Sequence, residues 1–299
     1  PGYFFGKLFG FAQVGSFAVV SLFALLNVFL IRAIAVRLGM HPLAGLIAGI
    51  TFLFATPAFA YAVTLYQHHI STAIILAAIY LLIRYNSIWS LIGVWMLCAL
   101  SISVDYPNFL MMLPMGIIAL GRTFIIKKEA FRVSLKIPFL RVLAMGSVIL
   151  PMAFFLWFNY SSYGDPLQLS GTVERSIEVK ADGSPYLETE VIKKRLKAKG
   201  QDLFIPEKSA LGSFNSRLIM HGFYIHFVSP DRGMLMYAPV MLFGVAGLIL
   251  ALKRKMKYTA LLVAVIGFNV LLYSMWDDPY GGWAFGSRYL IPSYAILSI

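Results

Sequence analysis

Long apolar runs separated by short polar connections dominate the sequence. A helix needs about 20 apolar residues to cross the hydrocarbon core of a bilayer. Runs of about this length lie near 12–31, 43–61, 66–83, 89–104, 106–121, 138–159, 233–252 and 259–275, and another begins near 289. The pattern predicts an all-α fold, namely a polytopic transmembrane helical bundle with about eight or nine spans.

The composition agrees with lipid as the main solvent. Hydrophobic residues make up 60% of the chain and charged residues only 13%, whereas roughly a quarter of the residues in a soluble domain are charged. A surface this apolar would expose large patches in water, so we reject a soluble globular protein. The single cysteine, Cys98, lies inside an apolar run and offers neither a disulfide framework nor a cysteine metal site.

The formal net charge of +12 is spread over the connections between apolar runs rather than over one folded basic face. We therefore expect no nucleic-acid partner. The basic residues fall in alternate connections, which the positive-inside rule assigns to the cytoplasm. They are Arg32, Arg37, Arg84, Arg122, Lys127, Lys128, Arg132, Lys136, Lys253, Arg254, Lys255 and Lys257. The pattern predicts a multi-pass protein of the plasma membrane with membrane lipids as partners.

One connection, residues 161–232, is long and polar, and the alternation places it outside the cell. We expect an extracytoplasmic module there, between transmembrane helices in 1–160 and in 233–299. Within it, "PYLETEVIKKRLKAKG" has Glu188 and Glu190 early, basic residues late and Gly200 at its end, which predicts a helix. The chain begins at Pro1, and its last apolar run is about half a span long. We therefore expect a fragment that lacks part of its membrane domain at both ends.

The densest group of polar and aromatic residues lies in "WDDPYGGWAFGSRYLIP", on the predicted external side. Its members of interest are Asp277, Asp278, Tyr280, Trp283, Arg288 and Tyr289. The carboxylates suit acid–base chemistry, the arginine suits a phosphate, and the flat rings suit sugars or a lipid headgroup. The alternative is an interfacial turn whose aromatic rings anchor at headgroup depth. The density of charged groups favours a site.

Three other external segments carry candidates. Asp105 lies at the tip of a tight hairpin, where it can position a substrate hydroxyl or cap the next helix. His68 and His69 are adjacent, so helical geometry points them about 100° apart and makes it difficult for the pair alone to chelate one metal. We expect one to face a cavity and the other to pack or to meet lipid headgroups. Arg232 in "SPDRG" can clamp a phosphate or pair with its neighbour Asp231.

Several segments together resemble the GT-C class of membrane glycosyltransferases, specifically prokaryotic relatives of the protein O-mannosyltransferase and lipid A aminoarabinose transferase group. The stretch "LLNVFLIRAIAVRLGMHPLAGLIAGITFLFATPAFAYAVTLYQHH" resembles the middle helices of that group. "SVDYPNFLMMLPMGIIAL" resembles its short acidic hairpin, and "NYSSYGDPLQLSG" the start of its large external loop. "SPDRGMLMYAPVMLFGVAGL" and "DDPYGGWAFGSRYLIP" resemble its two later external edges.

The resemblance implies a hexosyl or pentosyl transferase that moves a sugar from a polyprenyl-phosphate carrier to an acceptor on the extracytoplasmic face. It also implies that the main catalytic acid lies in a first external loop, for which this sequence has no counterpart. The remaining catalytic candidates are Asp105, Asp277 and Asp278, and the substrate-binding candidates are Arg232, Arg288, Tyr280, Trp283, Tyr289, His68 and His69. No cofactor or metal site is expected, although the sequence leaves a divalent metal open. The alternatives are a transporter or flippase of a lipid-linked or anionic substrate, and a non-catalytic membrane subunit with this fold.

Overall fold

The structure, a computed structural model, describes residues 12–129, 132–136, 138–173, 176–179, 185–187 and 212–299. The chain divides into two compact units. The first contains Pro1–Ala153 and Ser216–Ile299, and the second contains Phe154–Asn215. Each unit is described by itself.

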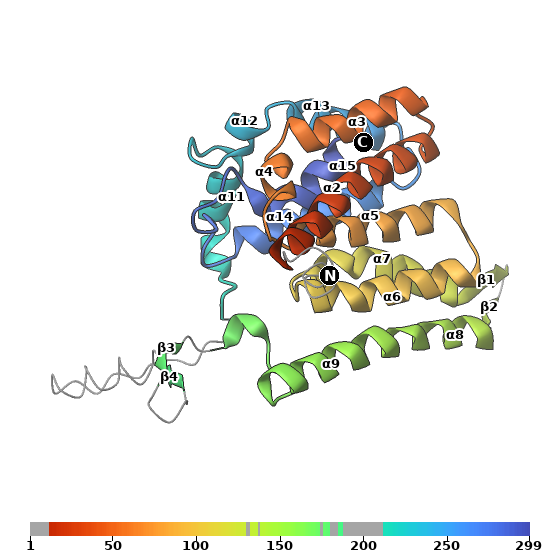
Figure 1. Cartoon of the computed structure of the whole chain (residues 1–299). Coiled ribbons are helices and arrows are strands. Elements are labelled where there is room, and N and C mark those ends of the chain that lie inside the picture. Colours follow the sequence, from red (N-terminus) through yellow and green to blue (C-terminus); the bar gives the residue numbers. More distant parts are fainter. Residues whose placement is uncertain (1–11, 130–131, 137, 174–175, 180–184, 188–211) are drawn as a thin grey trace. The chain divides into compact units, whose positions relative to one another are not determined.

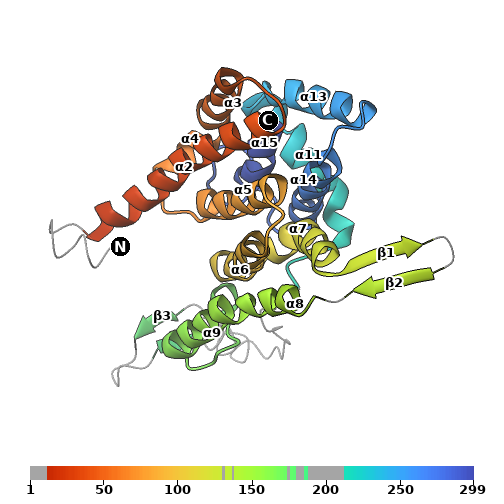
Figure 2. The ribbon, with the colours of Figure 1, turned by 90° about the vertical axis from the view of Figure 1, so that its right-hand side faces the viewer.

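The first unit is built from helices, as predicted. Its N-terminal part contains α2 (Ala12–Arg37), α3 (Pro42–Phe54), α4 (Ala58–Ala62), α5 (His68–Arg84), α6 (Ile88–Val104) and α7 (Asn108–Thr123). The hairpin β1 (Ile125–Glu129) and β2 (Arg132–Lys136) follows, then α8 (Phe139–Met145), η1 (Gly146–Val148) and the start of α9 (Ile149–Tyr163). Figure 2 shows this antiparallel hairpin projecting from the ends of α7 and α8. The sequence pattern did not predict this hairpin.

The C-terminal part of the first unit contains η3 (Ser216–Leu218), α11 (Ile219–Phe227), α12 (Met234–Tyr237), α13 (Met241–Lys253), α14 (Thr259–Ser274), η4 (Arg288–Leu290) and α15 (Ile291–Leu297). The residues 216–232, which the sequence analysis assigned to the external module, therefore belong to the helical unit. All residues of α15 are buried, because this helix packs against α2, α3, α5, α13 and α14 (Figure 1). This helix forms the centre of the core.

Neighbouring helices approach closely where small residues permit it. Helix α2 packs along α3 and α5. A side-chain carbon at Gly49 of α3 would lie 2.7 Å from the carbonyl oxygen of Val28 in α2. Since that distance is below van der Waals contact, only glycine allows this approach of the two backbones. Helix α5 packs against α6, α6 packs against α7, and α7 contacts α14.

Among the described residues, two helical segments are long and apolar enough to cross a membrane: Gln13–Arg37 and Phe139–Tyr163. Six further apolar helices among the described residues have 13 to 17 residues. The run predicted near 43–61 is not one helix, because α3 ends at Phe54 and α4 begins only at Ala58. Thr56 and Pro57 lie in the break, where proline disfavours helical geometry for the residue before it.

The second unit contains the end of α9, the 3-10 turn η2 (Ser170–Thr172) and the strands β3 (Ser176–Val179) and β4 (Pro185–Leu187). The strands pair antiparallel, with Ser176 opposite Leu187. The helix predicted from Pro185 to Gly200 is therefore wrong for its first three residues, which form β4. Its remainder, including Glu188 and Glu190, lies outside the described residues.

Candidate functional site

Four segments that are distant in the sequence meet at one end of the helical unit. They are the α4–α5 connection, the α6–α7 turn, α11 and the loop from Met275 to Ser287 between α14 and η4. Figure 1 shows α4 and α11 at this same end. The Tyr61 hydroxyl accepts a hydrogen bond from the Phe285 amide at 2.8 Å and lies 3.3 Å from the Phe285 carbonyl oxygen. These bonds join α4 to a loop that lies 224 residues further along the chain.

Tyr289 lies at the centre of the aromatic cluster at this end. Its ring stacks on Tyr273, with 4.5 Å between ring centroids and 9° between planes. The imidazoles of His68 and His226 meet it edge to face, at 6.0 Å and 6.2 Å between centroids. The rings of α5, α11, α14 and η4 are thus packed into one group, which fixes their relative positions.

Arg288 lies over two of these rings. Its guanidinium carbon is 4.5 Å from the Tyr66 centroid and 5.3 Å from the Tyr289 centroid, which are cation–π distances. Its Nε is buried without a hydrogen-bond partner. Within the described part of the chain, the structure places no carboxylate in ion-pair contact with this arginine. The site therefore holds a positive charge that is bound by rings rather than neutralised by an acid.

Asp105 ends α6, and its carboxylate points into the same cluster. It accepts hydrogen bonds from the Gln67 amide at 3.3 Å and from the Tyr273 hydroxyl at 3.4 Å. It does not cap α7, which begins after Pro107 without any side-chain cap. The capping alternative is therefore wrong. Burial raises the pKa of Asp105, and the two donors partly oppose this shift because they favour the ionised form.

Arg232 binds the loop rather than an acid. Its Nη1 donates to the Ala284 carbonyl at 2.7 Å, and its Nη2 donates to the Gly282 carbonyl at 2.6 Å. The expected alternative of an ion pair with Asp231 is wrong, since Asp231 is exposed and makes no such contact. Two of the guanidinium's donor groups are already used, so Arg232 positions the loop.

Asp278 also serves the loop. Its two carboxylate oxygens accept the amides of Gly281 and Gly282, each at 3.1 Å. Both glycines have positive φ, 67° and 65°, a region that residues with a side chain enter at a cost. This aspartate therefore stabilises a tight glycine turn.

The other candidates from the same segment lie outside the cluster. Asp277 is exposed, and Trp283 is fully exposed. Tyr280 is 40% exposed, and its ring lies 6.1 Å from that of His221. The structure therefore divides the predicted constellation into Arg288 and Tyr289 inside, Asp278 in the turn, and an outer group of Asp277, Tyr280 and Trp283.

The two adjacent histidines have different environments. His69 is buried, with Nε2 2.8 Å from the Ala58 carbonyl and Nδ1 3.3 Å from the Asn27 amide. It joins α2, α4 and α5 and has no role in the cluster. His68 is buried among the rings of Tyr61, Tyr66 and Tyr289, and its Nε2 has no hydrogen-bond partner. Only His68 belongs to the candidate site.

Sequence reasoning missed several residues that build the site. Gln67, Tyr66 and Tyr61 flank the histidine pair, and Tyr273 precedes the acidic loop by four residues. His226 of α11 lies 2.7 Å from the Ser287 hydroxyl and 3.0 Å from the Tyr273 carbonyl. The polar "YQHH" run was a usable signal for Gln67 and Tyr66. Nothing in the sequence pattern links Tyr273 or His226 to Asp105.

The described residues contain no group of three histidine, cysteine or acidic side chains that would hold a metal ion. The chain matches no protein-family model, no curated protein and no solved structure in the comparisons made with it.

Proposed function

We propose that the chain is a multi-pass membrane glycosyltransferase that moves a sugar from a polyprenyl-phosphate carrier to an acceptor on the extracytoplasmic face. The observation that carries this proposal is the joint placement of Asp105 and Arg288 at the two ends of the Tyr273–Tyr289 stack. A carboxylate, an arginine that has no acidic partner among the described residues, and a set of flat rings are groups that suit such a transfer. The resemblance to the GT-C class supports the same chemistry.

The surface of the helices supports a membrane setting. Phe139, Ile149 and Phe243 are 76%, 67% and 80% exposed. Apolar side chains exposed to this extent favour lipid over water. Helices of 16 or 17 residues are about 24–26 Å long, slightly shorter than the hydrocarbon core of about 30 Å, a mismatch that local thinning of the bilayer can accommodate. We infer that these helices, and not only the two longest ones, cross the bilayer.

The charge pattern supports the proposed orientation. Helix α5 begins at His68 in the candidate site and ends at Arg84, and α7 begins after Asp105 and ends near Arg122. The candidate site and these basic connections therefore lie at opposite ends of the same helices. Under the positive-inside rule, the basic ends face the cytoplasm and the site faces the outside.

In the proposed reaction, the acceptor hydroxyl gives its proton to a carboxylate, for which Asp105 is the described candidate. The acceptor oxygen bonds to the anomeric carbon as the bond from that carbon to the phosphate oxygen breaks. The polyprenyl phosphate leaves with that electron pair and a greater negative charge, which Arg288 would stabilise. A raised pKa suits Asp105 to this role because a stronger base accepts the proton more readily. Tyr273 and Tyr289 would hold the two charged groups at a set separation.

The test is sugar transfer by full-length protein reconstituted in vesicles with a radiolabelled polyprenyl-phosphate sugar. We expect Asp105→Asn to lower the transfer rate, while Asp231→Asn, an exposed acid outside the cluster, retains it. Arg288→Lys keeps a charge but loses the planar fork. Loss of a charged hydrogen bond costs about 2–3 kcal/mol, so we expect Arg288→Lys to bind the sugar donor roughly 30- to 150-fold more weakly. Arg254→Lys is the matched control.

Three outcomes would oppose the proposal. Equal donor affinity in folded Arg288→Lys and in the unaltered protein would remove Arg288 from the site. Donor movement across the bilayer without sugar transfer would favour the alternative of a transporter or flippase. Neither donor binding nor transfer in the full-length protein would favour a non-catalytic membrane subunit.

A further inference from the structure

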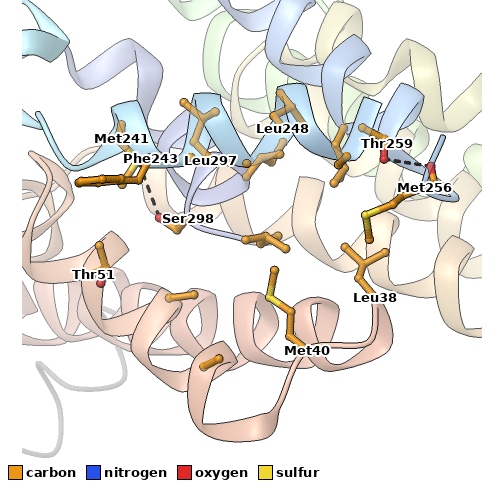
Figure 3. A pocket seen from close by; sticks show the side chains of 18 of the residues that line it. Leu38, Met40, Thr51, Met241, Phe243, Leu248, Met256, Thr259, Leu297 and Ser298 are labelled. Carbon is orange, nitrogen blue, oxygen red and sulfur yellow. Dashed lines mark hydrogen bonds between the residues drawn. The ribbon is translucent and has the colours of Figure 1, made fainter. Parts of the chain in front are cut away.

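A second feature, remote from the Asp105–Arg288 cluster, is an apolar groove of about 520 Å³ between α3 and α13 (Figure 3). The last residues of the chain, Ile296 to Ile299, also line it. Its walls are mainly apolar, with Ile47 on one side and Leu248 on the other. No protein segment among the described residues fills this space.

Small residues keep the groove open. Ala44 and Ala48 line it from α3, and Gly244 and Gly247 line it from α13. A side-chain carbon at Gly247 would meet no atom within 4 Å, whereas one at Gly244 would overlap the backbone of Leu297. Gly244 therefore lets α13 rest on the end of α15, and Gly247 faces open space one turn further along.

One end of the groove is basic. Leu38, Met40, Met256 and Lys257 are among the residues that line the groove, and Figure 3 shows Leu38 beside Met256. Arg37, Lys253, Arg254 and Lys255 flank this end and are all exposed. Neither 31–58 nor 238–260 contains an acidic residue. An apolar channel that ends beside several cations and no acid matches the chemistry of an anionic lipid.

We propose that this groove binds an anionic phospholipid of the cytoplasmic leaflet, with an acyl chain between α3 and α13 and its phosphate beside Lys257. The inference rests on the membrane setting and orientation of the proposed function. The 13 residues of α13 span about 20 Å, enough for a chain that crosses one leaflet of about 15 Å, half of the hydrocarbon core. The basic end belongs to the connections opposite the Asp105–Arg288 cluster, so this lipid is separate from the sugar donor.

The test is native mass spectrometry of the full-length protein released from mild detergent after incubation with phosphatidylglycerol or with phosphatidylcholine of the same chains. We expect one retained phosphatidylglycerol in preference to phosphatidylcholine. Gly247→Phe fills the groove and should lower retention at least tenfold. Gly267→Phe is the matched control, because Gly267 of α14 also faces open space but lies outside the groove.

A second pair of variants tests the headgroup. Lys257→Gln should weaken the preference for phosphatidylglycerol while leaving retention of phosphatidylcholine unchanged. Arg84→Gln, which removes an exposed charge from the same side of the protein at the end of α5, should keep the preference.

Unchanged phosphatidylglycerol retention in Gly247→Phe, or an unchanged preference in Lys257→Gln, would overturn the inference. Displacement of the phospholipid by a polyprenyl phosphate at equal concentration would also overturn it, because the groove would then belong to the donor. The proposed function fails separately. If these variants change phospholipid retention in a protein that transfers no sugar, the result would contradict the proposed transferase activity and still support the lipid site.

Discussion

The hydroxyl of Tyr273 donates a hydrogen bond to Asp105, and the ring of Tyr273 stacks 4.5 Å from that of Tyr289. One side chain therefore connects the carboxylate at the end of α6 to the residue next to Arg288. The hydrogen bond affects the charge state of Asp105, and the stacked ring sets the position of this carboxylate. These two effects can be separated by substitution.

Tyr273→Phe keeps the stack and removes only the hydroxyl. Since that hydroxyl stabilises the ionised carboxylate, its loss should raise the pKa of Asp105 further. If Asp105 acts as a base, the rise of the transfer rate with pH should move to higher pH. The measurement is the pH profile of sugar transfer, with Tyr237→Phe as a matched loss of a hydroxyl outside the cluster. An unchanged pH profile of the transfer rate would show that Tyr273 has no effect on the pKa of Asp105.

Asp105→Asn should change the dependence of stability on pH. Because the pKa of Asp105 is raised in the folded protein, the folded state binds more protons than the unfolded state between the ordinary value of about 4 and the raised value. The free energy of unfolding of the unaltered protein therefore falls as pH rises through that window. The amide does not titrate, so the variant should gain stability over the unaltered protein in the same window and keep that gain at higher pH.

Melting temperatures measured across that window would check this sign. Asp231→Asn, at an exposed position, should follow the unaltered protein at every pH. A variant that loses stability relative to the unaltered protein as pH rises would show that the ionised carboxylate stabilises the fold.

Arg232→Ala should loosen the loop near Gly282 and Ala284, because two carbonyls lose their charged donor. Hydrogen bonds of this kind contribute about 1–3 kcal/mol, toward the low end here because one lies at the surface. Hydrogen exchange should rise in residues 277–287 while α5 stays protected. If exchange rises equally throughout the helical unit, the effect is global and Arg232 has no special role in this loop.

Two glycines in this loop separate backbone strain from steric overlap. Gly282 and Gly286 have similar positive φ, 65° and 61°. A side-chain carbon at Gly282 meets nothing within 4 Å, but one at Gly286 lies 2.6 Å from Cγ of Pro57. Gly282→Ala should cost about 1–2 kcal/mol of conformational strain. Gly286→Ala should cost more, because Pro57 must also move. Equal losses in thermal unfolding would argue against the close contact.

Thiol labelling tests the orientation. In a protein with Cys98 replaced by Ser, Arg254→Cys should resist an impermeant reagent in intact cells, and Asp231→Cys should react. Both positions are exposed, so a permeant reagent should label both and serve as the control. The opposite pattern would reverse the proposed orientation and place the candidate site in the cytoplasm.

The sequence by itself determined the helical architecture and its charge distribution. Apolar runs with few strong helix breakers predict helices. Most of the predicted runs do contain a helix, because burial and backbone hydrogen bonding act locally along a continuous run. The break between α3 and α4 was visible only as Pro57 within an apolar stretch. Both hairpins depend on pairing between strands and were not predicted.

Tertiary structure decided which polar residues act together. In the sequence, Asp277 and Asp278 lie beside Arg288, yet one is exposed and the other stabilises a glycine turn. Asp105 is far away in the chain and reaches the cluster through Tyr273. Proximity in sequence cannot distinguish these cases, because the direction of a side chain depends on how the helices pack. Helical periodicity separated His68 from His69 in direction, but only the packing of α2 and α4 shows which of them faces the rings.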